Sequence, residues 1–176
     1  MKTTSQKIAA ALEQTFSEQG FAQPGVDSLK EAAGVSLRTL YKYYPSRIHM
    51  IHGALTLRHE RYMATLFSDI HTTGEAALLY VFDQVAHWMT HNAQTGCLFL
   101  SAVAAYPNEP MLKELLERHK AEIAENMLKV SGLNEVGHDL LLIHEGLMHS
   151  WPVCQDSALD AAKFWLTKLY RESQIG

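Results

Sequence analysis

Apolar residues recur at spacings of three and four along almost the whole chain, and the alternating pattern of a β-strand is nearly absent. This periodicity is typical of helices that bury one face. In the first segment the apolar stripe consists of Ile8, Ala11, Leu12, Thr15 and Phe16. Because glycine, proline and serine interrupt the periodicity at intervals, the pattern predicts an all-α fold of about nine helices.

Capping and turn residues define the expected ends of the helices. Thr3 and Gln6 have the spacing of a capping box at the start of the first helix, and Gly20 ends that helix. Pro152 is expected to end the penultimate helix, and Ser157 with Asp160 to cap the last one. The other helices are expected at residues 26–33, 37–43, 47 to about 70, 75 to about 92, 97–105, 111–130 and 135 to about 150, with the last ending near 172.

The 176-residue chain has enough apolar side chains, 47% of the total, to form one or two compact domains. No apolar run approaches the ~20 residues that a membrane-spanning helix needs, and the first residues lack a signal-peptide pattern. Two cysteines, Cys97 and Cys154, do not make a disulfide framework. We therefore expect a cytoplasmic protein that does not associate with membranes.

Charge is distributed unevenly, although the net charge of −4 taken alone argues against nucleic-acid binding. Residues 1–61 contain eight basic and five acidic residues, a net charge of +3, whereas the remaining residues carry −7. A basic N-terminal third on an acidic body suits a local DNA-binding module.

The segment from Ala32 to Ser36 separates two short predicted helices and has the composition of the turn in a helix-turn-helix. Its alanines allow the helices to approach closely, and Gly34 supplies the positive φ that ends the first helix. Val35 fills the angle between the two helices, and Ser36 caps the second.

The helix after this turn presents a polar face. Leu40 and Tyr44 are four residues apart and are expected to face the core. The residues that then face outward are Leu37, Arg38, Thr39, Tyr41, Lys42 and Tyr43. Arginine and threonine suit base edges in a major groove, and tyrosine and lysine suit phosphates, as does Arg47 at the start of the next helix. The competing interpretation is a solvated face on an ordinary helical hairpin.

Residues 5–60 resemble the tetracycline-repressor (TetR) family of bacterial transcription regulators, with the family's spacing kept across three helices. The matching residues are Ile8, Ala11, Phe16, Gly20, Phe21, Ala32, Ala33, Gly34, Val35, Ser36, Thr39, Leu40, Tyr41, Tyr44, Pro45, Ser46 and Leu55. The resemblance implies a helix-turn-helix DNA-binding domain at residues 1–46 and a helical ligand-binding and dimerisation domain at residues 47–176. The segment from Gly96 to Phe99, followed by alanines and Tyr106-Pro107, resembles one common subgroup of the family.

By this resemblance, residues 37–43 form the recognition helix, Tyr41 and Tyr43 contact the DNA backbone, and Arg47 stands where a phosphate-contacting lysine is usual. Gly25 occupies a position where a capping threonine or serine is common, which implies a phosphate contact from the backbone alone. Lys30 is a second departure, because the family usually has a small residue at this position. The two departures leave the operator sequence undetermined. The predicted DNA-binding residues are Gly25, Ser36, Leu37, Arg38, Thr39, Tyr41, Lys42, Tyr43 and Arg47.

Aromatic residues, methionines and two histidines on the helices of the second domain are candidates for a ligand pocket. They are Met63, Phe67, Phe82, His87, Trp88, Phe99, His144 and Trp151. Their character predicts a small, mostly apolar inducer, with histidine as a polar contact. Ordinary core packing is the competing interpretation for each of them.

Histidines also raise an alternative function, an all-helical metal-binding or enzymatic bundle. His87 and His91 are four residues apart and could share a metal, but they lie on a polar stripe, so a solvated face is the simpler interpretation. Cys97 is a candidate sensor thiol, against the plainer interpretation of a structural thiol. No paired carboxylates, nucleophile–base set or glycine-rich phosphate loop supports an enzyme, and we expect no metal and no cofactor.

The last two predicted helices carry more apolar surface than one protomer can easily cover, which favours a homodimer built as a four-helix bundle. The apolar residues are Leu140, Ile143, Leu147, Leu159, Ala162, Trp165, Leu166 and Leu169. The sequence therefore predicts a dimeric repressor that binds a palindromic DNA operator and is released by a small-molecule inducer.

Overall fold

The computed structural model describes residues 3–174, and within them every regular element is a helix. The predicted all-α class is therefore confirmed. The nine helices are α1 (Thr4–Gln19), α2 (Val26–Ala33), α3 (Leu37–Tyr43), α4 (Arg47–Phe67), α5 (Glu75–Asn92), α6 (Leu98–Ala105), α7 (Pro110–Ser131), α8 (Gly137–Cys154) and α9 (Asp156–Glu172). None of these helices is both long enough and apolar enough to cross a bilayer.

The chain divides into two compact units that are discontinuous in sequence. The units are residues 3–61 with 98–117, and residues 62–97 with 118–174. Helices α4 and α7 each contribute residues to both units. The functional boundary expected between residues 46 and 47 stays a prediction, and the outer ends of those two domains, residues 1–2 and 175–176, lie outside the described part of the chain.

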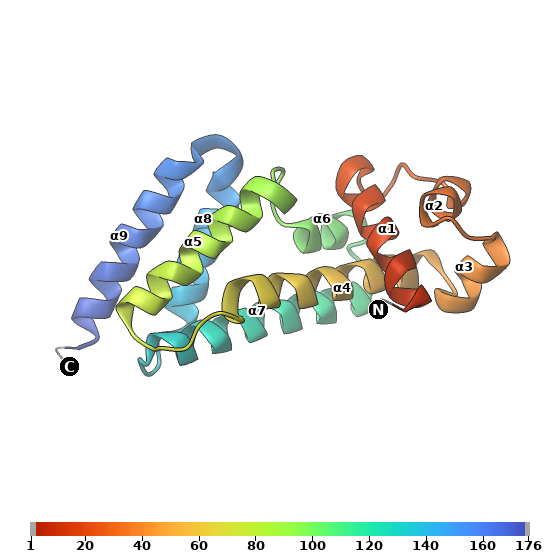
Figure 1. Ribbon diagram of the computed structural model, residues 1–176. Coiled ribbons are helices and arrows are strands. Elements are labelled where there is room, and N and C mark those ends of the chain that lie inside the picture. The colour runs from red at the N-terminus through yellow and green to blue at the C-terminus, as the bar shows by residue number, and fades with distance from the viewer. Residues whose placement is uncertain (1–2, 175–176) are drawn as a thin grey trace. The chain divides into compact units, whose positions relative to one another are not determined.

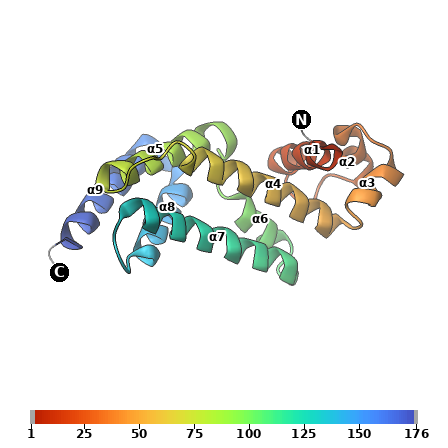
Figure 2. The same ribbon diagram turned by 60° about the horizontal axis from the view of Figure 1, so that its bottom comes forward.

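In the first unit, the short helices α1, α2 and α3 form one cluster, which Figures 1 and 2 show at the red and orange end of the ribbon. Helix α2 packs against both α1 and α3. The centre of the cluster is apolar, and its fully buried side chains are Ile8, Leu12, Phe16, Leu29 and Leu40. The apolar stripe predicted for the first helix is thus its buried face, and the predicted capping box of Thr3 and Gln6 is present.

In the second unit, α5, α8 and α9 pack against one another, as Figure 1 shows. Its interior contains aromatic and aliphatic side chains from all three helices, including Phe82, Trp88, Leu140, Trp151 and Leu166. Gly74 begins α5 with a φ of 115° and donates its N–H to the carbonyl of Val130 at 2.9 Å, so α5 begins against the end of α7.

The junction between α8 and α9 differs from the prediction. Pro152 does not end α8, because it lies in the last turn, where it costs one helical hydrogen bond while Gln155 still donates to the carbonyl of Trp151 at 3.0 Å. The chain then turns at Gln155 alone, with a φ of 44°. Helix α9 starts immediately afterwards at Asp156, so the predicted cap at Ser157 is wrong.

Candidate functional site

The turn between α2 and α3 has the geometry expected from its sequence. Gly34 adopts a φ of 63°, and its N–H donates to the carbonyl of Glu31 at 3.0 Å. The N–H of Val35 donates to the carbonyl of Lys30 at 3.1 Å, which completes a Schellman motif and satisfies the last carbonyls of α2. Local hydrogen bonds therefore fix the angle at which α3 leaves α2.

Ser36 begins α3 as predicted. Its Oγ accepts a hydrogen bond from the backbone N–H of Thr39 at 3.2 Å and lies 2.9 Å from the Thr39 hydroxyl. The cap satisfies an N–H that a seven-residue helix would otherwise expose to water. Leu40 is fully buried, which fixes the rotation of α3 about its axis.

The outward face of α3 contains the residues that the sequence predicted for DNA. Leu37, Tyr41 and Tyr43 are 40%, 42% and 37% exposed. Arg38 and Lys42 are exposed and Thr39 is half-buried. The Lys42 Nζ lies 5.8 Å from the centre of the Tyr43 ring. Two cations, a hydroxyl and two phenols thus share one short helix, a set that suits phosphates and base edges.

Tyr44 holds α3 against the rest of the unit, a role that residue types alone did not specify. Its hydroxyl donates to the carbonyl of Ser5 at 3.1 Å and lies 3.0 Å from the Ser5 hydroxyl. Its ring lies over Gly53 of α4, where an added Cβ would come within 2.2 Å of the ring. A glycine in the middle of α4 therefore makes room for the tyrosine.

Gly25 is exposed and stands at the N-cap of α2, where no side chain makes a capping hydrogen bond. Arg47, in contrast, points to the interior of the first unit. Its Nη1 donates to the carbonyl of Pro24 at 2.8 Å, its Nη2 donates to the carbonyl of Phe21, and its Nε donates to the hydroxyl of Tyr106 at 2.8 Å. The structure does not place this guanidinium among the exposed groups of α3.

A buried ion-pair cluster joins α1 to α4. The carboxylate of Glu13, only 4% exposed, accepts from Arg58 at 2.9 Å and from Arg61 at 2.7 Å. Arg58 is 5% exposed, whereas the side chain of Arg61 is 43% exposed. Nothing in the sequence indicated that Glu13 is buried or which two arginines are its partners.

The predicted ligand-binding residues separate into groups. Phe82, Trp88 and Trp151 are buried together in the core of the second unit, and His144 is buried with its ring 6.4 Å from that of Phe82. Met63 and Phe67 are partly buried against the same core. His87 is exposed and lies beside His91, with ring centres 4.2 Å apart and the ring planes tilted by 36°. Phe99 is buried in the first unit, among different residues from the rest.

Tyr62, Glu145 and Lys120, which the sequence did not single out, form a hydrogen-bonded series with His144, in which Tyr62 and His144 are buried and Glu145 and Lys120 are partly buried. The Tyr62 hydroxyl lies 2.6 Å from Nε2 of His144, and Nδ1 of His144 lies 2.8 Å from the Glu145 carboxylate. Lys120 donates to that same carboxylate, and its Nζ lies 3.9 Å from the sulfur of Cys97.

The protonation states in this series follow from burial and charge. Burial lowers the pKa of His144, so the ring is neutral. Burial acts to raise the pKa of Glu145, but the hydrogen bond from His144 and the charge of Lys120 outweigh it and hold that pKa at about 2. Because the carboxylate only accepts, Nδ1 of His144 carries the proton and Nε2 accepts from Tyr62. The hydrogen bonds therefore run in one direction, from the Tyr62 hydroxyl to His144 and from His144 to the Glu145 carboxylate.

Comparison with known proteins agrees with this geometry. Residues 2–53 match the family model described as bacterial regulatory proteins, tetR family. Comparison with curated proteins found no match.

Solved structures of low sequence identity share the whole fold. A TetR-type transcriptional regulator from Streptomyces avermitilis superposes with a TM-score of 0.80 at 19% identity, covering 98% of this chain and 99% of that one. A TetR-family regulator from Streptomyces coelicolor superposes with a TM-score of 0.79 at 18% identity, covering 95% of this chain and 94% of that one. A TetR regulator from Haloarcula marismortui superposes with a TM-score of 0.79 at 17% identity, covering 97% of each chain. Residues 2–53 are thus similar to the N-terminal domain of the tetR family, and the chain as a whole has the fold of solved TetR-type regulators.

Proposed function

We propose that this protein is a DNA-binding, ligand-responsive repressor that binds a palindromic operator as a homodimer. The observation that carries the proposal is the outward face of α3, where Arg38, Tyr41, Lys42 and Tyr43 are exposed on a helix fixed by Ser36 and by a buried leucine. Two phenols and two cations exposed on one short helix suit contacts with phosphates and base edges.

The exposed residues have distinct proposed roles. Arg38 and Thr39 read base edges in the major groove, and Tyr41, Lys42 and Tyr43 contact phosphates. Leu37 and Ser36 lie at the start of α3, where recognition helices enter the groove. Gly25 contributes a backbone contact at the start of α2.

Selection of bound duplexes from a random DNA pool tests this proposal. We expect a site with dyad symmetry, because a two-fold dimer presents two copies of α3 to successive major-groove faces. Arg38→Ala should relax the base preference at one position of each half-site. A selected site without dyad symmetry would contradict the proposed mode of binding.

A small, mostly apolar molecule is the proposed inducer, and the second unit is where we place its site. Phe82, Trp88 and Trp151 supply apolar surface there, with Met63 and Phe67 partly buried beside them. His144, whose Nδ1 hydrogen is held by Glu145, is the proposed polar contact. The contributions of His87, which is exposed, and of Phe99, which belongs to the first unit, remain predictions.

Ligand response is tested by a thermal-shift screen of apolar small molecules, followed by the operator affinity of each hit. A true inducer must raise the melting temperature and weaken DNA binding, typically by about 5–150-fold for couplings of 1–3 kcal/mol. Trp88→Ala should abolish both effects together. A hit that keeps both effects in this variant would place the ligand elsewhere.

The dimer is proposed to form through α8 and α9, but only partly through the side chains the sequence suggested, of which Trp165 is exposed and Leu166 is not. Leu166 is only 1% exposed and packs within its own protomer. Leu142, Phe164 and Trp165 are instead 73%, 64% and 53% exposed on the same two helices. They form the apolar surface that a second copy would cover.

An enzymatic or metal-binding bundle is the weaker alternative. Residues 3–174 contain no group of three or more histidine, cysteine or carboxylate side chains arranged to hold a metal ion. We propose a cytoplasmic regulator without catalytic activity, and the DNA selection above separates the two possibilities.

A further inference from the structure

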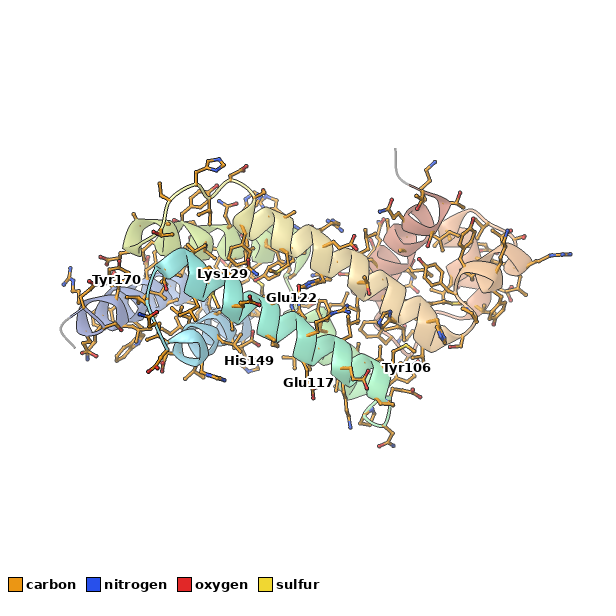
Figure 3. The ribbon with its side chains drawn as sticks, turned by 90° about the horizontal axis from the view of Figure 1, so that it is seen from below. Tyr106, Glu117, Glu122, Lys129, His149 and Tyr170 are labelled. Carbon is orange, nitrogen blue, oxygen red and sulfur yellow. The ribbon has the colours of Figure 1, made fainter. Side chains whose placement is uncertain are left out.

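Arg47 and Tyr106 meet in the first unit although 59 residues separate them in sequence. Arg47 begins α4, and Tyr106 follows the last residue of α6, at the corner before α7 that Figure 3 labels. The guanidinium of Arg47 donates to three acceptors: the carbonyls of Phe21 and Pro24 and the hydroxyl of Tyr106. Both carbonyls belong to the turn between α1 and α2.

The hydrogen bonds around this point form a closed set. The Tyr106 hydroxyl accepts from Nε of Arg47 at 2.8 Å and uses its single hydrogen to donate to the carbonyl of Phe21 at 3.3 Å. The Phe21 carbonyl therefore accepts from both Arg47 and Tyr106, in keeping with its two lone pairs. The centre of the guanidinium also lies 5.7 Å from the centre of the Phe16 ring, on which Phe21 stacks.

We propose that Arg47 and Tyr106 form a latch that positions the α1–α2 turn for DNA binding, and that Arg47 does not itself contact a phosphate. The guanidinium holds the carbonyl of Pro24, the residue directly before Gly25, which caps α2. The latch therefore fixes where α2 begins and, through the α2–α3 turn, the placement of α3. This inference uses only the DNA-binding role of the first unit and is independent of the proposed inducer.

The latch requires an arginine. A guanidinium presents planar N–H groups in a fixed fork and can reach three acceptors in different directions, whereas an ammonium is a single point donor. A lysine at position 47 would keep the positive charge but could not reproduce all three contacts. The Arg47→Lys substitution therefore separates the effect of the positive charge from the effect of the three hydrogen bonds.

The experiment combines a double-mutant cycle with salt-dependent DNA binding. Arg47→Lys, Arg47→Gln, Tyr106→Phe and the Arg47→Lys/Tyr106→Phe double variant are compared with the unaltered protein. Unfolding in urea measures coupling between the two side chains without any DNA. Binding to labelled duplex DNA of mixed sequence, at several salt concentrations, measures affinity and the number of neutralised phosphates.

We expect the two positions to be coupled, so that the double variant is less destabilised than the two single variants predict together. Tyr106→Phe, which removes one oxygen, and Arg47→Lys should each weaken binding to the duplex by about fivefold, the lower end of couplings between distant sites. The slope of log affinity against log salt should be unchanged in all four variants, including Arg47→Gln. Lys42→Gln, on the exposed face of α3, is the matched control that should lower this slope by about 0.9.

Two results would overturn the latch. One is additive destabilisation at positions 47 and 106. The other is a slope reduced by about 0.9 in Arg47→Gln with affinity unchanged in Tyr106→Phe, which would make Arg47 a phosphate contact. Absence of duplex binding by the unaltered protein would refute the DNA-binding role, while the cycle in urea would still decide whether the latch exists.

Discussion

At the scale of single residues, the buried carboxylate of Glu13 is expected to be costly to replace. It accepts from Arg58, which is itself buried, and from the half-exposed Arg61. Glu13→Gln should lower the free energy of unfolding by about 3 kcal/mol, because a buried guanidinium loses its carboxylate partner. Urea denaturation measures this difference.

Arg61→Gln is the matched control for that prediction. Its side chain is 43% exposed and screened by water, so its loss should cost less than about 1 kcal/mol. Equal losses in the Glu13 and Arg61 variants would show that burial of the Glu13–Arg58 pair does not set the energy.

Gly53 offers a second test, because it lies directly under the Tyr44 ring. A Cβ at this position would come within 2.2 Å of the ring, so Gly53→Ala should destabilise the protein by about 1–3 kcal/mol. Gly146→Ala on α8 is the control: its Cβ meets nothing within 4 Å, and the gain in helix propensity should stabilise by up to about 1 kcal/mol. If both variants shift the urea midpoint in the same direction, the contact with Tyr44 is not the cause.

His144 predicts how stability depends on pH. Its folded pKa lies below the ordinary value of 6.5, so below that pH the unfolded chain takes up a proton that the folded chain does not. Stability should therefore fall on acidification from about pH 6.5, by at most about 1.4 kcal/mol per pH unit for this one group. Glu145 adds to the loss below pH 4.5, because its folded pKa is about 2.

Comparison with His144→Gln isolates this contribution. The variant keeps His119, whose ring lies 5.7 Å from that of Tyr62, and removes the His144 imidazole. Its stability should vary less between about pH 6.5 and pH 5 than that of the unaltered protein. If the two proteins show the same dependence of unfolding free energy on pH, the pKa of His144 does not differ between the folded and unfolded states.

At the scale of elements, the cap of α3 links stability to DNA binding. Ser36→Ala removes the acceptor for the Thr39 N–H and should cost about 1 kcal/mol. Ser36→Asp restores an equally good cap but adds a negative charge beside the DNA. It should therefore recover stability in urea and still bind duplex DNA more weakly than the alanine variant. Stronger binding by the aspartate variant would place the start of α3 away from the phosphates.

Local signals made most of the elements predictable. Thr3, Gly34 and Ser36 act within four residues of themselves, so their caps can be inferred from sequence and are present in the structure. The junction at Gln155 was not predictable, because a single residue with positive φ replaces the glycine or serine that usually marks such a turn. Helix ends thus follow from sequence only where the cap itself is local.

The site is less predictable than the fold, because its contacts join distant parts of the chain. The residue types on α3 indicated an exposed polar face, since helical spacing and one buried leucine determine which side is outward. The partners of Arg47 depend on Phe21, Pro24 and Tyr106 meeting in three dimensions. Tyr62 and His144 likewise lie 82 residues apart, and no spacing rule connects them.

At the scale of the whole molecule, the apolar face on α8 and α9 predicts the oligomeric state. Phe164 and Trp165 are exposed with their rings 5.4 Å apart, and Lys168 lies 5.2 Å from the Trp165 ring. A Phe164→Glu/Trp165→Glu variant should be monomeric, because two carboxylates would lose their water at a dimer interface. Its helical content should not change, since both side chains already face outward. Sedimentation velocity gives the mass, and circular dichroism gives the helicity.

Leu100→Glu is the matched control for the dimer. Leu100 is 44% exposed on α6, in the first unit, and its replacement should leave the dimer intact. The monomeric variant should also bind a selected palindromic site far more weakly than the unaltered dimer does. Each protomer then binds its half-site alone, without the gain in affinity that comes from linking two binding modules. A dimeric mass for Phe164→Glu/Trp165→Glu together with a monomeric mass for Leu100→Glu would move the interface from α8 and α9 to α6.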